Sequence, residues 1–123
     1  MPMHEPFDPW QWAADHGTPI RQARLEHARG YTDGHTIWLD DAHTAAEARC
    51  TLTHEIVHLC NGHRTHQPPK EEWRVRAATA RLLIPDVTWI RDWPGTVWEL
   101  ADELDVTPEV IRDRVRVWER TRT

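Results

Sequence analysis

Residues 44–60 read TAAEARCTLTHEIVHLC, and their spacing predicts one long helix. Thr44 and Glu47 stand three residues apart, as in a capping box, where each side chain bonds to the backbone N–H of the other at the start of a helix. Gly62 is typical of the residue just beyond a helix C-terminus, because glycine adopts the left-handed conformation at little cost. We therefore expect this helix to run to about Cys60 and to stop at Gly62.

The same segment contains the pattern HEIVH at residues 54–58, which indicates metal chemistry. A helix places His54 and His58 one turn apart on one face, where both imidazoles can bind a single zinc ion. Glu55 is rotated away from that face, so it can reach a water molecule at the ion and act as a general base without being a ligand. The opposite face is apolar, as a helix packed on a core requires: it carries Leu52, Ile56 and Leu59.

A catalytic zinc needs a third protein ligand and one open position. The best candidates are Glu71 and Glu72, at the start of a second predicted helix over residues 70–84. Pro85 ends that helix, because proline removes a backbone donor and clashes with the preceding turn. A glutamate from a following helix is a known third ligand for the His-Glu-x-x-His pattern. The spacing alone leaves both glutamates open.

Two further histidines, His63 and His66, follow the metal-site helix. The metzincin pattern requires a histidine six residues after the second ligand, and Arg64 occupies that position. We therefore expect both histidines in a loop at the rim of the site. A closed structural zinc site would recruit one of them as a fourth ligand, but such a site has no need of a base like Glu55.

The remaining patterns predict an α+β fold in a single domain over residues 1–123. Apolar residues between Ile20 and Leu39, interrupted by Gly30 and by Asp33-Gly34, predict a β-hairpin and a small antiparallel sheet. About five helices are expected with it. Their signals are N-caps, capping boxes and prolines, found at residues 9–16, 44–60 and 70–84, in a short turn over 86–92, and from Thr96 and Thr107 onward.

Composition restricts the possible partners and compartments. The net charge is −5 at pH 7, whereas a protein that mainly holds nucleic acid usually carries a basic surplus. Cys50 and Cys60 lie on one predicted helix roughly 15 Å apart, farther than the limit of about 7 Å for a disulfide. The start, MPMHEPFDPW, has no signal-peptide pattern, and no apolar run approaches the roughly 18 residues of a membrane span. We expect a cytoplasmic protein without a membrane partner.

Two stretches together resemble the ImmA/IrrE family of zinc metallopeptidases: CTLTHEIVHLCNG at 50–62 and EEWRVRAATARLLIP at 71–85. The resemblance implies a zincin-like core, made of the active-site helix and a following ligand helix. In the family the third ligand is the glutamate thirteen residues before the closing proline, which here is Glu72. Two positions depart from the pattern: Val57 stands where the family often has glycine, and Arg76 where it often has aspartate or asparagine.

The resemblance also implies a function. Members of the family cut a helix-turn-helix repressor and so release phage, mobile-element or stress genes from repression. It implies Zn²⁺ as cofactor, with His54, His58 and Glu72 as ligands, and a protein substrate. The strand around Thr36–Leu39 corresponds to the edge on which such peptidases lay out an extended substrate, which strand addition would favour.

Residues 97–118 suggest an alternative, because they fit a helix-turn-helix template. In that hypothesis the protein is a DNA-binding or partner-binding regulator with a non-catalytic zinc site, and Arg112, Arg114 and Arg116 lie on the recognition helix. Phosphate contacts dominate DNA affinity, and acidic residues surround these arginines: Glu99, Asp102, Glu103, Asp105, Glu109 and Asp113. We therefore expect the two helices to pack on the core, and nucleic acid binding to be unlikely.

Overall fold

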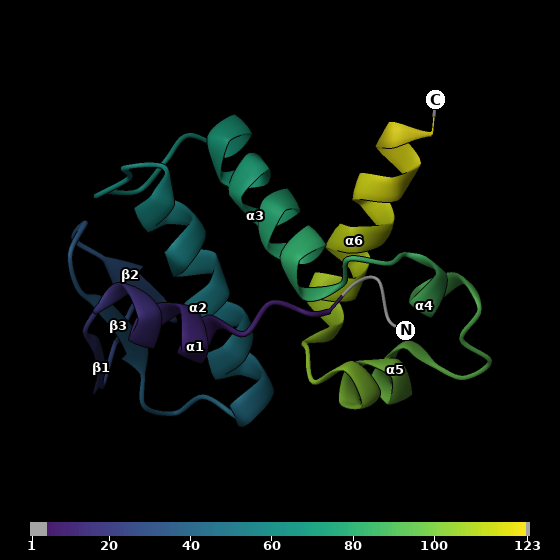
Figure 1. Ribbon diagram of the computed structural model, residues 1–123, viewed down its shortest axis with the longest axis horizontal. Helices are drawn as coiled ribbons and strands as arrows, with labels where there is room; N and C mark the ends of the chain where they lie inside the picture. The colour runs from purple at the N-terminus through teal and green to yellow at the C-terminus, as the bar shows by residue number, and fades with distance from the viewer. Residues whose placement is uncertain (1–4, 123) are drawn as a thin grey trace.

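The computed structural model describes residues 5–122, which form six helices and three strands (Figure 1). This confirms the α+β class predicted from the sequence. The elements in chain order are α1 (Pro9–His16), β1 (Ile20–Ala23), β2 (Gly30–Thr32), β3 (Ile37–Asp40), α2 (Ala45–Cys60), α3 (Pro69–Leu83), α4 (Thr88–Arg91), α5 (Val97–Leu104) and α6 (Pro108–Thr121).

The sheet is mixed, so the expectation of a wholly antiparallel sheet was wrong. Its order is β1-β3-β2, with β2 antiparallel to β3 and β1 parallel to β3. The predicted hairpin exists between β2 and β3, where Gly34 adopts a φ of +93° in the turn. β1 instead joins the far side of β3, with Ile20 opposite Ile37. Turn residues fix a hairpin locally, but no local signal fixed the direction of a strand that arrives earlier in the chain.

The central position of β3 corrects a second expectation. The strand that includes Thr36–Leu39 was expected at the substrate edge, but β3 has a neighbour on each side. Its residues Ile37 and Leu39 are fully buried. The free edges of the described sheet are therefore those of β1 and β2.

Both ends of α2 follow the sequence signals. At the start, Glu47 N donates to Thr44 Oγ1 at 3.2 Å, and Thr44 N donates to Glu47 Oε1 at 2.8 Å, which completes the capping box. At the end, Gly62 takes a φ of +73°. Its N–H donates to Leu59 O at 3.0 Å, and the next N–H, of His63, donates to His58 O at 2.9 Å. These two bonds define a Schellman motif, which folds the chain back along the helix.

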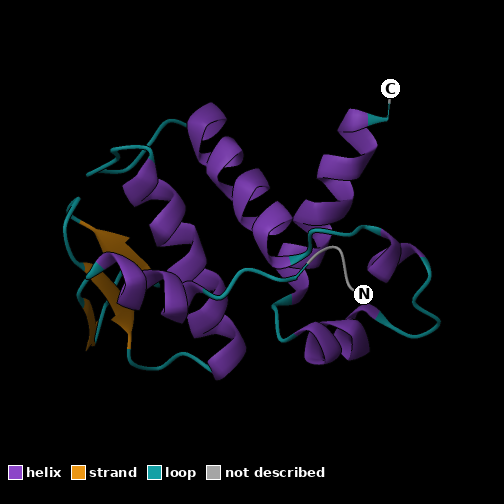
Figure 2. Cartoon of the chain, viewed as in Figure 1, coloured by secondary structure: helices purple, strands orange, loops and turns teal. Residues whose placement is uncertain are grey.

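Two apolar clusters hold α2 in the middle of the molecule, between the sheet and α3 (Figure 2). The first joins α2 to the sheet through Ile37, Leu39, Leu52 and Ile56. The second joins α2 and α3 to the C-terminal helices through Cys50, Ala80, Leu83, Ile84, Leu100, Ala101, Val106, Val110 and Ile111. Burial on both sides fixes the rotation of α2, and this rotation decides where its histidines point.

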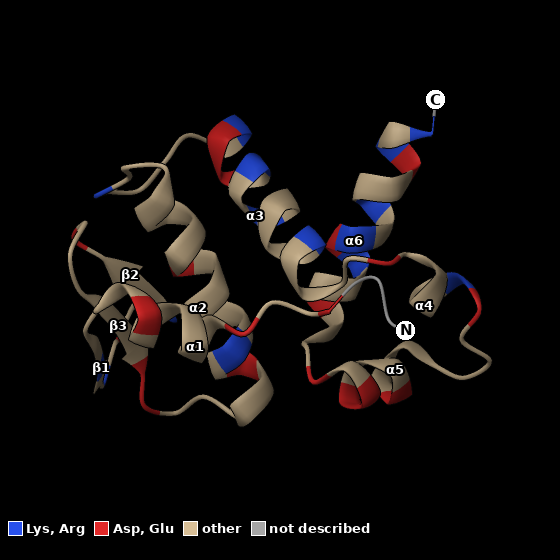
Figure 3. Cartoon of the chain, viewed as in Figure 1, with Lys and Arg blue, Asp and Glu red and all other residues tan. Residues whose placement is uncertain are grey.

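Charged residues of α6 also attach the C-terminal helices to the rest of the molecule. Arg114 donates from Nε to Ile84 O at 2.6 Å and from Nη2 to Pro85 O at 3.2 Å, and so satisfies carbonyl groups at the end of α3. Arg116 stacks over the ring of Trp73 on α3, 5.2 Å from its centroid. Figure 3 shows acidic residues along α5 and both signs of charge on α6. Within residues 5–122, no helix has the length and apolarity that crossing a membrane demands.

Candidate metal centre

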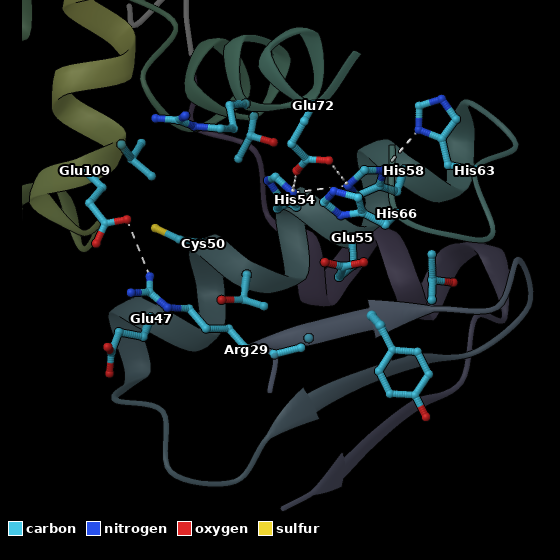
Figure 4. Close-up of a pocket in the computed structure, with 18 of the residues that line it drawn as sticks. Arg29, Glu47, Cys50, His54, Glu55, His58, His63, His66, Glu72 and Glu109 are labelled. Atoms are coloured by element: carbon cyan, nitrogen blue, oxygen red, sulfur yellow. Dashed lines mark hydrogen bonds and ion pairs between the residues drawn. The ribbon is translucent and has the colours of Figure 1, made fainter. Parts of the chain in front are cut away.

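Two histidines from α2 and one glutamate from α3 meet where the two helices face each other (Figure 4). His54 Nε2 lies 2.7 Å from Glu72 Oε1, and His58 Nε2 lies 3.3 Å from Glu72 Oε2. The two histidine Nε2 atoms are 3.2 Å apart. Together these side chains form a group that could hold a metal ion, with ligand atoms within 4.8 Å of one another.

The donor set and its spacing fit a zinc ion. Zinc takes imidazole nitrogen and carboxylate oxygen at about 2.0–2.2 Å in a tetrahedral arrangement, which sets neighbouring donor atoms about 3.3 Å apart. The separations of 2.7, 3.2 and 3.3 Å are close to that spacing. Three protein donors leave a fourth position free, as a catalytic site requires.

The structure separates the two glutamates that spacing alone could not. Glu72 points to His54 and His58, whereas the Oε1 atom of Glu71 lies 3.6 Å from His63 Nε2. Glu71 Oε2 also accepts a bond from Arg74 at 3.2 Å. Both glutamates lie in the first turn of α3, where the helix dipole favours negative charge.

Burial sets the protonation of the central groups. It lowers the pKa of His54 and of His58, in each case as the largest cause, so both rings favour the neutral form that a metal ligand needs. Burial also raises the pKa of Glu55 to about 7, with the negative charge of Glu72 as the second cause. A carboxyl group with that pKa exchanges protons readily near neutral pH.

Glu55 faces a cleft of about 640 Å³ that also contains the histidine and glutamate group. The cleft lies between β2, α2, the loop after α2, α3 and α6. Figure 4 shows Glu55 beside the two histidines and Arg29 reaching toward Glu109, whose Oε2 lies 3.5 Å from Arg29 Nη1. The site is therefore open to a ligand larger than water.

Gly30 is a site residue that the sequence reasoning treated only as a turn signal. A Cβ atom at this position would lie 2.7 Å from Thr51 Cγ2 and 3.4 Å from Glu55 Cγ. The backbone of β2 thus approaches α2 next to Glu55 because residue 30 has no side chain. A glycine at the start of a strand was the available signal, but only the structure shows what it approaches.

The two residues that depart from the family pattern, Arg76 and Val57, lie in different environments. Arg76 forms a two-point ion pair with Asp113 of α6, Nε to Oδ2 at 3.1 Å and Nη2 to Oδ1 at 2.6 Å, at the wall of the cleft. At the position where the family often has an acid, this chain therefore has an arginine that pairs with an acid of α6. Val57 is buried, at 6% exposure.

The remaining predicted residues divide between the cleft and the surface. His63, His66 and Cys50 line the cleft. Cys50 is buried and Cys60 exposed, and both are free thiols, as their spacing on α2 predicted. Thr107 N donates to Cys50 Sγ at 3.4 Å, so this thiol also links α2 to the start of α6.

Two histidines and one glutamate that could hold a metal, beside a buried glutamate, are compatible with a metallopeptidase-type site. The family model of the IrrE N-terminal-like domain, of peptidase family M78, matches residues 13–116. The chain therefore belongs to this peptidase family, which confirms the resemblance seen in the two sequence stretches. Comparison with curated proteins and with solved structures found no match.

Proposed function

We propose that this protein is a zinc-dependent endopeptidase whose substrate is a helix-turn-helix repressor of a phage or other mobile element. The observation that carries the proposal is the convergence of His54, His58 and Glu72 beside the buried Glu55 in one cleft. Family membership supports the peptidase activity. A repressor acts on DNA inside the cell, so this substrate implies a cytoplasmic location.

The residues that would hold zinc are His54, His58 and Glu72. When bound, zinc supplies a Lewis acid that polarises a carbonyl group and favours ionisation of water at neutral pH. The chain supplies the geometry, because α2 and α3 hold the three donor atoms at the spacing described above. It also favours the neutral state of both imidazoles through their burial.

Glu55 is the proposed general base. Its carboxylate accepts a proton from the attacking water, and then transfers that proton to the nitrogen of the departing amine. Its burial places the group out of bulk water, next to the histidines that hold the metal. Since Glu55 is not among the ligands, its replacement should affect the reaction and leave metal binding intact.

An extended segment of the substrate would bind along β2. This strand is at an edge of the sheet and borders the cleft at Gly30, Tyr31 and Thr32. Edge strands bind extended peptides through main-chain hydrogen bonds. The close approach of Gly30 to Glu55 brings such a segment next to the proposed base.

The C-terminal helices act in this proposal as packing elements, and DNA is not the principal partner. Arg114 and Arg116, two of the three arginines of the helix-turn-helix template, are engaged with α3. The residue after α5, in the connection to α6, is Asp105, which has a φ of 54°. Its negative charge disfavours contact with DNA phosphates at this turn.

The test is co-expression with any helix-turn-helix repressor encoded near the gene, followed by mass spectrometry of the fragments. The wild type should cut the repressor at one or a few positions, and 1,10-phenanthroline should stop the cleavage. Glu55→Gln should retain zinc and lose about 10²–10⁴-fold in cleavage rate, as removal of a general base typically costs. Equal cleavage by the two proteins would refute the role of Glu55, and failure of the wild type to cut would refute the proposed substrate.

A further inference from the structure

We propose that Glu71 and His63 orient the imidazole of His58, so that its Nε2 atom presents a lone pair to the metal. The inference rests on the metal site of the proposed function and adds two positioning residues to it. Glu71, His63 and His58 form a continuous chain of contacts from the surface of α3 to the centre of the site.

The two ring nitrogens of His58 face different partners. Nε2 points to the metal group, 3.3 Å from Glu72 Oε2 and 3.2 Å from His54 Nε2. Nδ1 points away from that group and lies 3.0 Å from His63 Nδ1. His63 therefore contacts the nitrogen that would not bind the metal. Figure 4 shows this contact on the side of His58 away from His54.

A hydrogen bond between two Nδ1 atoms has two possible directions. If His58 donates, its Nε2 carries no proton and can bind a metal. If His63 donates, the neutral His58 ring carries its proton on Nε2 and cannot bind through that atom. The direction of this one bond therefore decides whether His58 is ready to be a ligand.

Glu71 selects the first direction. Its Oε1 atom lies 3.6 Å from His63 Nε2, on the other side of that ring. A carboxylate favours an N–H over a lone pair on the nitrogen that faces it, so Glu71 favours the tautomer of neutral His63 that has its proton on Nε2. In that tautomer His63 Nδ1 is an acceptor for the Nδ1–H of His58, the direction that a metal bound at His58 Nε2 also requires. Partners beyond the ligands commonly fix the tautomer of a metal-binding histidine in this way.

The turn after α2 holds the His63 ring in place. Gly62 in the left-handed conformation completes the Schellman motif, whose longer hydrogen bond joins His63 N to His58 O. In this motif the residue after the glycine usually makes an apolar contact with the last turn of the helix. Here that contact is the one between the two imidazoles. The His63 side chain is only 13% exposed, so water competes weakly for the bond.

The experiment compares zinc affinity and ring protonation in four variants. His63→Leu removes the acceptor, whereas in His63→Asn the side-chain oxygen stands close to the former Nδ1 position and retains it. Glu71→Ala removes the selecting carboxylate from the surface of α3, where the substitution leaves no buried gap. His66→Leu is the control, because His66 also lines the cleft but is exposed.

Competition with a chromophoric chelator should show about 10–100-fold weaker zinc binding by His63→Leu, the usual cost of losing such a partner. Glu71→Ala should lose less, and His63→Asn and His66→Leu should stay within a few-fold of the wild type. Long-range ¹H–¹⁵N spectra of the zinc-loaded wild type should show the His58 proton on Nδ1, hydrogen-bonded to His63, and the His63 proton on Nε2; His63→Leu should lose that hydrogen bond.

Three results would overturn the inference. Equal zinc affinity of His63→Leu and wild type would exclude a positioning role. Equal losses in His63→Asn and His63→Leu would indicate that His63 is itself a ligand. A His63 proton on Nδ1 in the zinc-loaded wild type would exclude the assigned hydrogen-bond direction. Failure of the wild type to bind zinc would instead refute the metal site of the proposed function, whereas zinc binding that His63→Leu leaves unchanged refutes the positioning role alone.

Discussion

The metal centre and the C-terminal helices both contain many charged or ionisable side chains, but they arrange them differently. In the metal centre, two imidazoles and a carboxylate point at one another with no cation among them. Along α6, Arg114 donates to backbone carbonyl groups, Arg116 stacks on the Trp73 ring, and Asp113 pairs with Arg76 of α3. Imidazole nitrogens and a carboxylate oxygen that converge on one point form a donor set that suits a metal ion, whereas dispersed and matched charges indicate packing. The comparison predicts different consequences for mutations in the two regions.

The largest expected effect is on zinc content, which should differ between substitutions of the neighbouring residues Glu72 and Glu71. Glu72→Gln should lose stoichiometric zinc, because the amide replaces a charged ligand. Glu71→Gln should retain about one zinc per chain, because the amide oxygen can still face the N–H of His63 as an acceptor. Elemental analysis after dialysis measures both. If Glu71→Gln lost zinc and Glu72→Gln retained it, Glu71 would be the third ligand, and the distinction between Glu72 as ligand and Glu71 as partner of His63 would be wrong.

A second prediction concerns the arginines of α6. Arg114→Ala leaves two carbonyl groups at the end of α3 without their donor, and one of them belongs to the buried Ile84. The free energy of unfolding should fall by about 1–3 kcal/mol. Arg112→Ala, at an exposed position of the same helix, should change it by no more than about 0.5 kcal/mol. Urea unfolding of both variants provides the measurement.

Gel shifts with the same two variants test the packing role directly. We expect no tight binding of duplex DNA by the wild type. Binding with a steep dependence on salt that weakens in Arg112→Ala would favour the regulator hypothesis.

The third prediction uses two glycines of the same conformation. Gly62 after α2 and Gly17 after α1 have φ values of +73° and +62°, and a Cβ atom at either would meet nothing within 4 Å. Replacement of either by alanine should therefore cost a similar strain of about 1–2 kcal/mol. Only Gly62→Ala should also weaken zinc binding, because the turn at Gly62 places His63 beside His58. Equal zinc affinities in the two variants would show that the turn does not support the metal centre.

The parts of the fold that the sequence predicted depend on contacts between residues close in the chain. The capping box of Thr44 and Glu47 joins residues three apart, and the shared face of His54 and His58 joins residues four apart. Such spacings follow from helix geometry alone. Glu72, eighteen residues from His54, was singled out from Glu71 only through the family pattern.

The parts that were missed depend on distant contacts. The parallel pairing of β1 with β3 depends on how the chain crosses the sheet. Arg76 finds its acid at Asp113, thirty-seven residues later on another helix. His63 was expected at the rim, but the direction of its ring depends on the exact turn after Gly62. Sequence periodicity indicates local secondary structure and does not predict which distant residues pair.

The smallest expected effect is on the pH dependence of stability, and it arises from the two capping boxes at the starts of α2 and α5. Hydrogen bonds from the backbone of Thr44 and Thr96 lower the pKa of Glu47 and of Glu99 below the ordinary value of 4.5. A carboxyl group whose pKa is lower in the folded state stabilises that state above its unfolded pKa, and this contribution is lost as the pH falls through the folded pKa. Stability should therefore decrease as the pH falls below about 4.5.

The variants Glu47→Gln and Glu99→Gln should each make that decrease shallower, because glutamine keeps the capping bond but does not titrate. Thermal unfolding between about pH 5 and pH 3 measures it, against the slope of the wild type. If the two regions unfold together, both variants shift the same single transition, since an all-or-none transition has one stability. If Glu99→Gln instead changes a separate transition in which α2 stays folded, the C-terminal helices form a separate unfolding unit. In that case their packing does not determine the geometry of the metal centre.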